Sequence, residues 1–119
     1  MPESRINPRY RTFAYGRIHG IMEGNNLLKN ISITGCCIEC AAQVDNIQPD
    51  TEYQLEIKPE RAAHIGKFKL LVERKWIRSE DSFNEVGFNI IAFPKGKLFQ
   101  RYVDYLAFRS SETNATSEN

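Results

Sequence analysis

Hydrophobic and polar residues alternate along most of the chain, which is the period of a β-strand with one buried face. The alternation is clearest at 52–58, where Tyr53, Leu55 and Ile57 are separated by charged or amide residues. Comparable patterns predict further strands at 11–23, 27–33, 36–44, 68–77 and 86–93. Between them lie segments rich in Gly, Asn, Asp, Ser and Pro, which favour turns. We therefore predict an all-β domain, with residues 24–26 (Gly-Asn-Asn) as the turn of its first hairpin.

After Pro94 the hydrophobic period lengthens from two residues to about 3.6, the period of an α-helix. One helix is predicted at about 95–107, with an apolar stripe made by Leu98, Phe99, Tyr102, Val103 and Leu106. Residues 109–119 are mostly Ser, Thr, Glu and Asn, and are predicted to be disordered. Because the connections between strands are short, the strands should pair antiparallel. The expected architecture is a small β-barrel or sandwich flanked by one helix.

The composition is that of one soluble domain and names no partner. The 119 residues are 41% hydrophobic and 26% charged, with a net charge of +1, which is enough to build one core. We therefore expect one domain at 11–108. Residues 1–10 are basic and lack apolar anchors, so we expect them to form a flexible segment. No targeting segment or membrane helix is recognised, and the three cysteines at 36–40 are read as reduced buried thiols, so a cytoplasmic location is expected. The chain lacks catalytic, phosphate-loop and metal-ligand motifs. We therefore expect neither an enzyme nor a bound cofactor or metal.

Two polar stretches carry the candidate chemistry. Arg5 and Arg9 are separated by three residues, and a proline between them favours an extended segment rather than a helix. Two guanidinium groups so placed can bind opposite ends of one flat ligand. Each group matches the geometry of phosphate oxygens and of the O6/N7 edge of guanine. The second stretch contains Asn30, Ser32 and Gly35, which offer an amide, a hydroxyl and a residue free to turn tightly. The pair predicts a nucleotide-binding site.

In this order and spacing, Arg5-x-x-x-Arg9 followed by Asn30-x-Ser32-x-x-Gly35 resembles the PilZ domain, the bacterial receptor module for cyclic di-GMP. The resemblance covers about residues 5–108. It implies a six-stranded antiparallel PilZ-type β-barrel with a C-terminal α-helix, and cyclic di-GMP as the ligand. The two arginines would contact phosphates and guanine, the amide and the hydroxyl would bond a guanine edge, and the glycine would allow the turn beside it.

Two further residues are candidates for the same site. Arg11 is a possible extra phosphate ligand, and Trp76 is a candidate aromatic contact, although packing is the commoner role of a tryptophan on a strand. The resemblance also implies a conformational change on binding that signals to a protein partner in the control of motility, biofilm or polysaccharide. DNA, RNA and membrane insertion are not expected.

Two alternatives remain open at this stage. The first is a protein-interaction adaptor on the same fold that binds no nucleotide. The second is a small β-barrel that binds single-stranded nucleic acid, for which Phe13 and Tyr15 beside Arg11 and Arg17 give a faint basic and aromatic pattern. The near-neutral net charge speaks against the second alternative.

Overall fold

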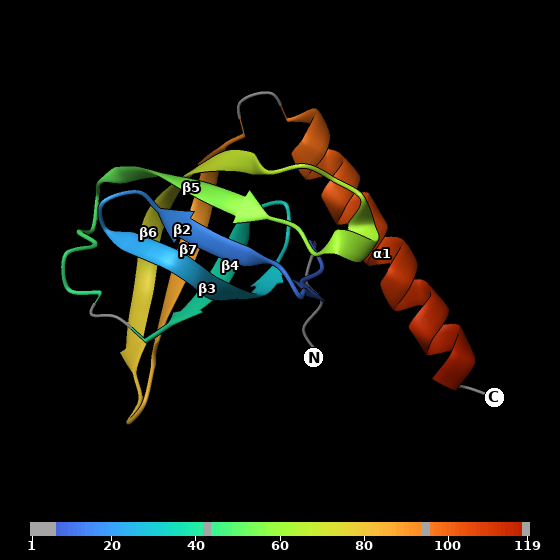
Figure 1. Ribbon diagram of the computed structural model, residues 1–119, viewed down its shortest axis with the longest axis horizontal. Helices are drawn as coiled ribbons and strands as arrows, with labels where there is room; N and C mark the ends of the chain where they lie inside the picture. Colours follow the sequence, from blue (N-terminus) through green and yellow to red (C-terminus); the bar gives the residue numbers. More distant parts are fainter. Residues whose placement is uncertain (1–6, 42–43, 94–95, 118–119) are drawn as a thin grey trace.

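A computed structural model describes residues 7–41, 44–93 and 96–117 of the chain. It contains seven β-strands, a short 3-10 helix at Arg61–Ala63 and one α-helix (Figure 1). The elements in chain order are β1 (Tyr10–Arg11), β2 (Tyr15–Ile18), β3 (Met22–Ile31), β4 (Gly35–Cys40), β5 (Glu52–Lys58), β6 (Phe68–Ser79), β7 (Asn84–Ala92) and α1 (Lys97–Ser117).

The sheet closes on itself. Its strands follow the order β3–β2–β5–β6–β7–β4, and β4 pairs back onto β3 with every pairing antiparallel. The short β1 is the first piece of an interrupted strand, because Arg11 pairs with Asn30 and Tyr15 pairs with Leu27 of the same β3. Counted in this way the barrel has six strands, so the predicted six-stranded antiparallel barrel with a C-terminal helix is confirmed.

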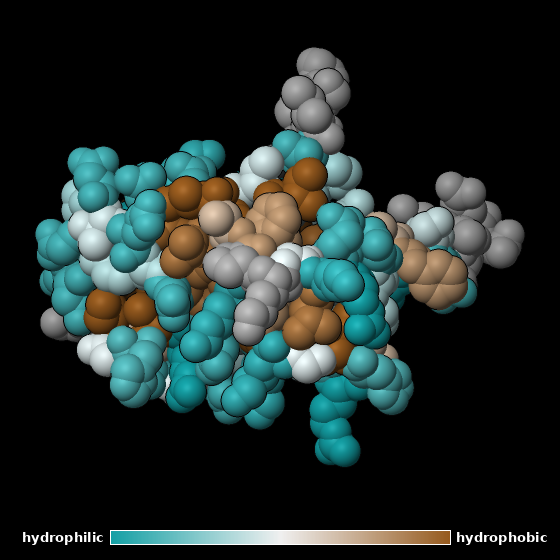
Figure 2. Space-filling view, turned by 90° about the horizontal axis from the view of Figure 1, so that it is seen from above, coloured by the Kyte–Doolittle hydropathy of each residue, from teal (hydrophilic) through white to brown (hydrophobic). Residues whose placement is uncertain are grey.

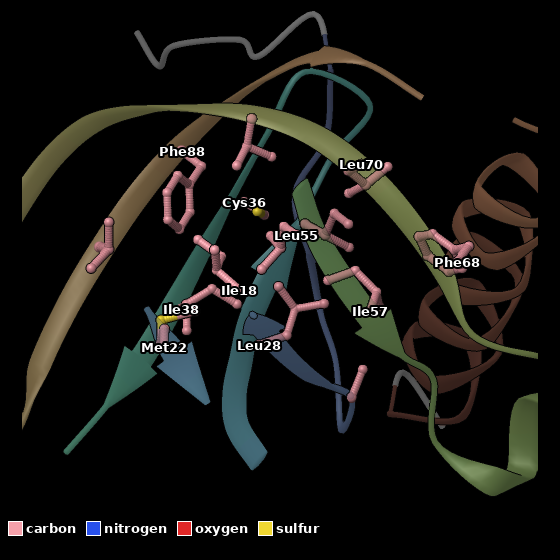
Figure 3. Close-up of a cluster of buried hydrophobic side chains, with 14 of the residues drawn as sticks. Ile18, Met22, Leu28, Cys36, Ile38, Leu55, Ile57, Phe68, Leu70 and Phe88 are labelled. Atoms are coloured by element: carbon pink, nitrogen blue, oxygen red, sulfur yellow. The ribbon is translucent and has the colours of Figure 1, made fainter. Parts of the chain in front are cut away.

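The inward side chains of the strands fill the barrel with a single apolar core (Figure 3). On β5, Leu55 and Ile57 are fully buried, as their alternation with polar residues predicts. The helix packs its apolar stripe against the barrel, where the rings of Phe99 and Tyr102 both lie 5.9 Å from the ring of Phe68. Burial of such large side chains, at roughly 1.5–3 kcal/mol each, holds the helix to the strands.

The first hairpin differs from its prediction. The chain turns at residues 19–21, with Gly20 at φ +80°, and not at the Gly-Asn-Asn run. That run lies inside β3 as a bulge, where Gly24 takes φ +84° and the pairing with β2 shifts register. The side-chain amide of Asn26 closes the bulge by donating to the carbonyl oxygens of Gly16 and Glu23, at 3.0 and 3.1 Å. The prediction was wrong because turn residues also suit bulges.

The helix is longer than predicted. It continues through Ser117, so both its expected end near 107 and the disorder expected from 109 are wrong up to that residue. Arg109 supplies a reason, because its guanidinium donates to Glu60 at 2.8 Å and to the backbone carbonyl of Arg11. It also lies 5.3 Å from the centre of the Phe13 ring. These contacts hold the extra turns near β1, and composition does not show them.

Among the described residues, no helix combines the length and apolar character that a membrane crossing requires.

Candidate functional site

Arg9 and Asn30, which are 21 positions apart in the sequence, meet at the surface of the barrel. Arg9 Nη1 donates a hydrogen bond to Asn30 Oδ1 at 2.9 Å. Gly35 completes the contact, because a Cβ there would lie 3.3 Å from Arg9 Nη2 and 2.9 Å from the carbonyl oxygen of Phe88. The clash with the backbone oxygen of Phe88 is the one that excludes a side chain here, and the glycine also lets the end of Arg9 lie close to the turn. The structure brings together three of the residues that the two motifs single out.

Ser32 has a structural role in the turn that joins β3 to β4. Its backbone N–H donates to the carbonyl of Gly35 at 2.8 Å, and its hydroxyl accepts from the N–H groups of Thr34 and Gly35 at 3.1 and 3.2 Å. The side chain is almost completely buried. The hydroxyl thus fixes the turn that places Gly35 against Arg9, and its predicted contact with a base edge stays a prediction.

A hollow of about 400 Å³ opens beside this contact. We call it the β4–β7 hollow, and its lining residues are Arg9, Lys29, Asn30, Cys37, Lys75, Trp76, Arg78 and Glu85. Four of these side chains are basic and one is acidic, so the formal charge of the lining is +3. A concave surface of this charge attracts anions.

One row of paired residues runs across the floor of the β4–β7 hollow. Asn30 pairs with Cys37, Cys37 pairs with Gly87, and Gly87 pairs with Trp76, so the row crosses β3, β4, β7 and β6. A side chain at Gly87 would overlap the indole of Trp76, which shows that the ring lies directly over the glycine. With 39% of its surface exposed, the indole offers a stacking face to a planar ligand.

Two β-bulges add a lysine each to the β4–β7 hollow. Between Leu28 and Asn30 the register of β3 shifts against β4, and Lys29 is the extra residue. Between Arg74 and Trp76 the register of β6 shifts against β7, and Lys75 is the extra residue. A bulge turns two neighbouring side chains towards the same face. Each lysine therefore joins the motif or aromatic residue next to it in lining the hollow.

Glu85 is a nearly buried carboxylate, 2% exposed, that binds two of the cations. Lys29 Nζ donates to one of its oxygens and Arg78 Nη2 donates to the other. The hydrogen bond from Lys29 holds the pKa of Glu85 below its ordinary value of 4.5, and the same bond raises the pKa of Lys29. Both shifts favour the charged forms of Glu85 and Lys29, and the carboxylate holds the two cations in place.

Cys37, the thiol of the hollow, and its neighbour Cys36 both have raised pKa values. Burial raises the pKa of Cys37, with a further contribution from Glu85, and burial raises the pKa of the core residue Cys36 to about 12. Both therefore stay protonated at neutral pH, and a protonated thiol is a poor nucleophile. The described residues contain no cluster of three or more His, Cys, Asp or Glu side chains that could hold a metal ion.

Apart from Ser32, which lies in the turn described above, the sequence-predicted residues fall into three groups. Arg9, Asn30 and Trp76 line the β4–β7 hollow, and Gly35 lies against Arg9. Arg11 is exposed on β1 and does not line the hollow, although its carbonyl accepts from the helix. Arg5 lies outside the described residues.

Sequence reasoning missed five residues of the site: Lys29, Cys37, Lys75, Arg78 and Glu85. Arg78 follows Trp76 by two positions, so strand alternation places the two on the same face. Lys29 and Lys75 directly precede Asn30 and Trp76, and alternation would place them on the opposite face. The two register shifts that bring them to the hollow are visible only once the strands are paired.

No protein-family model and no curated protein matches this chain. Several solved structures share its fold, and two of them serve for comparison. One is the inhibitor of motility MotI/DgrA of Bacillus subtilis, with a TM-score of 0.75, 17% sequence identity and coverage of 92% of this chain and 53% of that chain. The other is K. pneumonia MrkH in complex with c-di-GMP, with a TM-score of 0.64, 14% identity and coverage of 98% and 55%. The chain spans about half the length of each, and the likeness confirms the predicted PilZ-type fold.

Proposed function

We propose that this protein is a receptor for cyclic di-GMP and that the dinucleotide binds in the β4–β7 hollow. The observation that carries the proposal is the contact of Arg9 with Asn30 and Gly35 at the edge of a cationic hollow that also contains an exposed indole. The ligand has two phosphates and two guanines, so it requires cations, polar groups for a base edge, and a flat surface for stacking. The complex of MrkH with c-di-GMP, on a similar fold, supports the same ligand class.

Each group of the hollow then has a chemical task. Arg9 and Arg5 bind phosphate or the O6/N7 edge of guanine, since a guanidinium offers parallel N–H donors to either. The amide of Asn30 bonds a guanine edge, and a second base stacks on Trp76. Lys29, Lys75 and Arg78 are not in the motifs and add charge for the phosphates, which gives the affinity a dependence on salt.

The response to the ligand is a conformational change that a protein partner detects. The segment that carries Arg9 is attached to the barrel through the two-residue strand β1, which pairs with β3 at Tyr10 and Arg11. A ligand held by Arg9 and Asn30 would add contacts between that segment and β3, and would change the surface that they present together. We assign no catalytic role to the protein.

Isothermal titration calorimetry with cyclic di-GMP tests the proposal. We expect binding by the wild type, and a loss of about 1–3 kcal/mol in Arg9→Ala, because one bidentate contact to guanine or phosphate disappears. Arg101→Ala is the matched control, since Arg101 is exposed on α1 and does not line the hollow. No heat of binding with tens of micromolar ligand, or equal affinities in wild type and Arg9→Ala, would refute the site.

The same titration addresses the two alternatives. An adaptor that binds no nucleotide predicts no binding of the dinucleotide by the folded wild type. A single-stranded nucleic acid binder predicts strongly salt-dependent binding of an oligonucleotide and none of cyclic di-GMP.

A further inference from the structure

A second polar surface lies on the side of the barrel away from the β4–β7 hollow. In the closed ring of six strands, β2 and β5 are neighbours and stand opposite the neighbouring pair β4 and β7. Figure 1 draws β2 and β5 in front and β4 and β7 behind them. We call the outer face here the β2–β5 surface, and its residues are Phe13, Tyr15, Arg17, Leu27, Glu56, Lys58, Lys67 and Lys69.

One edge of the β2–β5 surface is apolar. Phe13 is 70% exposed, Tyr15 is 41% exposed and Leu27 is 37% exposed. Tyr15 and Leu27 form a cross-strand pair. The neighbours of Phe13, Thr12 and Ala14, are buried, so Phe13 and Tyr15 both point away from the core. Exposed aromatic and aliphatic side chains grouped in this way are typical of a contact surface.

The rest of the β2–β5 surface is basic. Lys58 pairs with Tyr15 across the strands, and it shares with Lys67 and Arg17 a shallow hollow of about 180 Å³. Lys69 lies opposite Glu56 on the next strand. None of these three lysines forms an ion pair with another side chain in the part of the chain that the structure describes.

Figure 2 shows the molecule from above, with the side of β2 and β5 along the lower edge. Hydrophilic side chains follow this edge. Apolar residues also reach the surface elsewhere in the same view.

The carboxylates of this surface decide between two kinds of anionic partner. Arg17 is held by Glu56 at 2.8 Å and by Glu23 at 3.8 Å, so negative charges lie among the positive ones. A nucleic acid carries one phosphate after another, and would be repelled by embedded glutamates. A protein segment can place separate carboxylates on the lysines and an apolar side chain on the aromatic edge.

We propose that the β2–β5 surface docks an acidic segment of a partner protein that also carries apolar residues. The carboxylates of that segment pair with Lys58, Lys67 and Lys69, and its apolar residues pack on Phe13, Tyr15 and Leu27. This surface is a second binding site, and the inference does not rest on the dinucleotide site. Its position opposite the β4–β7 hollow leaves the two sites able to bind independently.

Fluorescence anisotropy with a labelled model peptide tests the proposal. The probe is a 15-residue repeat of Glu-Glu-Leu, and the comparison probes are the same peptide with Lys in place of Glu and a 15-nucleotide oligo-dT. We expect the acidic peptide to bind the full chain and the other two probes to bind much more weakly. Tighter binding of the oligonucleotide or of the lysine peptide would overturn the proposal.

Charge reversal locates the binding. We expect Lys58→Glu/Lys67→Glu to weaken the acidic peptide at least tenfold, and Leu27→Ser to weaken it several-fold. The matched control is Lys97→Glu/Arg101→Glu on α1, which should leave the affinity within twofold. Equal binding by the Lys58→Glu/Lys67→Glu variant and the wild type, with both folded by circular dichroism, would overturn the proposal.

The dinucleotide titration separates this inference from the proposed function. Lys58→Glu/Lys67→Glu should bind cyclic di-GMP as the wild type does. Retained peptide binding in a protein that binds no dinucleotide would refute the receptor function and leave the docking surface standing. Dinucleotide binding without any binding of the acidic peptide would refute the docking surface alone.

Discussion

Replacement of Glu85 by glutamine should both destabilise the protein and release two cations of the β4–β7 hollow. Glutamine keeps the shape of the side chain but removes the charge that holds Lys29 and Arg78. Loss of one member of a fully buried ion pair costs about 3–5 kcal/mol. Here the side chains of Lys29 and Arg78 are 37% and 60% exposed, so water can solvate them after the change. We therefore expect a smaller loss of about 1–3 kcal/mol, the scale of charged hydrogen bonds.

The stability that Glu85 contributes depends on pH in a definite direction. The folded-state pKa of Glu85 lies below 4.5, so its ionised form stabilises the fold above that value. The stabilisation is lost as the pH falls through the folded-state pKa, because both the folded and unfolded proteins are then protonated. The difference in unfolding free energy between wild type and Glu85→Gln should accordingly be full near neutral pH and shrink in acid.

Urea denaturation, followed by circular dichroism at neutral pH and at several pH values below 4.5, measures this difference. The dinucleotide affinity of the variant should fall as well, because Lys29 loses its ion pair and Arg78 keeps only the one with Glu80, at 3.3 Å. A difference that is the same at every pH, or equal stability of the two proteins at neutral pH, would show that the carboxylate does not hold the two cations.

Three more predictions concern single positions. Gly87→Ala should displace the indole of Trp76, seen as a shift in tryptophan fluorescence together with weaker dinucleotide binding; an unchanged spectrum would show that the ring does not depend on the glycine. Arg109→Ala removes the bond to Glu60 and the contact with Phe13, so backbone amides at 107–117 should exchange faster with deuterium, and unchanged exchange would contradict the role of Arg109. Cys37 should react slowly with a thiol reagent and more slowly still with cyclic di-GMP present; equal rates would place the ligand elsewhere.

The fold could be predicted because its determinants are local. The alternation of Tyr53, Leu55 and Ile57 marks a half-buried strand whatever its partners are, and the longer period after Pro94 marks a helix. The first turn was misplaced because Gly24 suits a bulge as well as a turn, and only the pairing of β2 with β3 decides between them. The last turns of the helix depend on Arg109, whose contacts with Glu60 and β1 join residues far apart in sequence.

The candidate site could be predicted only in part for the same reason. The motif residues Arg9, Asn30 and Gly35 have a recognisable spacing, and the structure places them together. Lys29 and Lys75 reach the hollow through bulges, and a shift of register by one residue moves a side chain to the opposite face of a sheet. Period alone therefore does not place them.

The net charge of +1 conceals two basic surfaces on opposite sides of the barrel. The β4–β7 hollow has a formal charge of +3, and the β2–β5 surface with the neighbouring Glu23 has a formal charge of +2. The rest of the sequence therefore has a formal charge of −4. Electrostatic attraction is screened over about 8 Å at physiological ionic strength, whereas even the shortest extent of the molecule is 25 Å. Each surface therefore attracts its own anion, and reversing the charge of one should leave binding at the other unchanged.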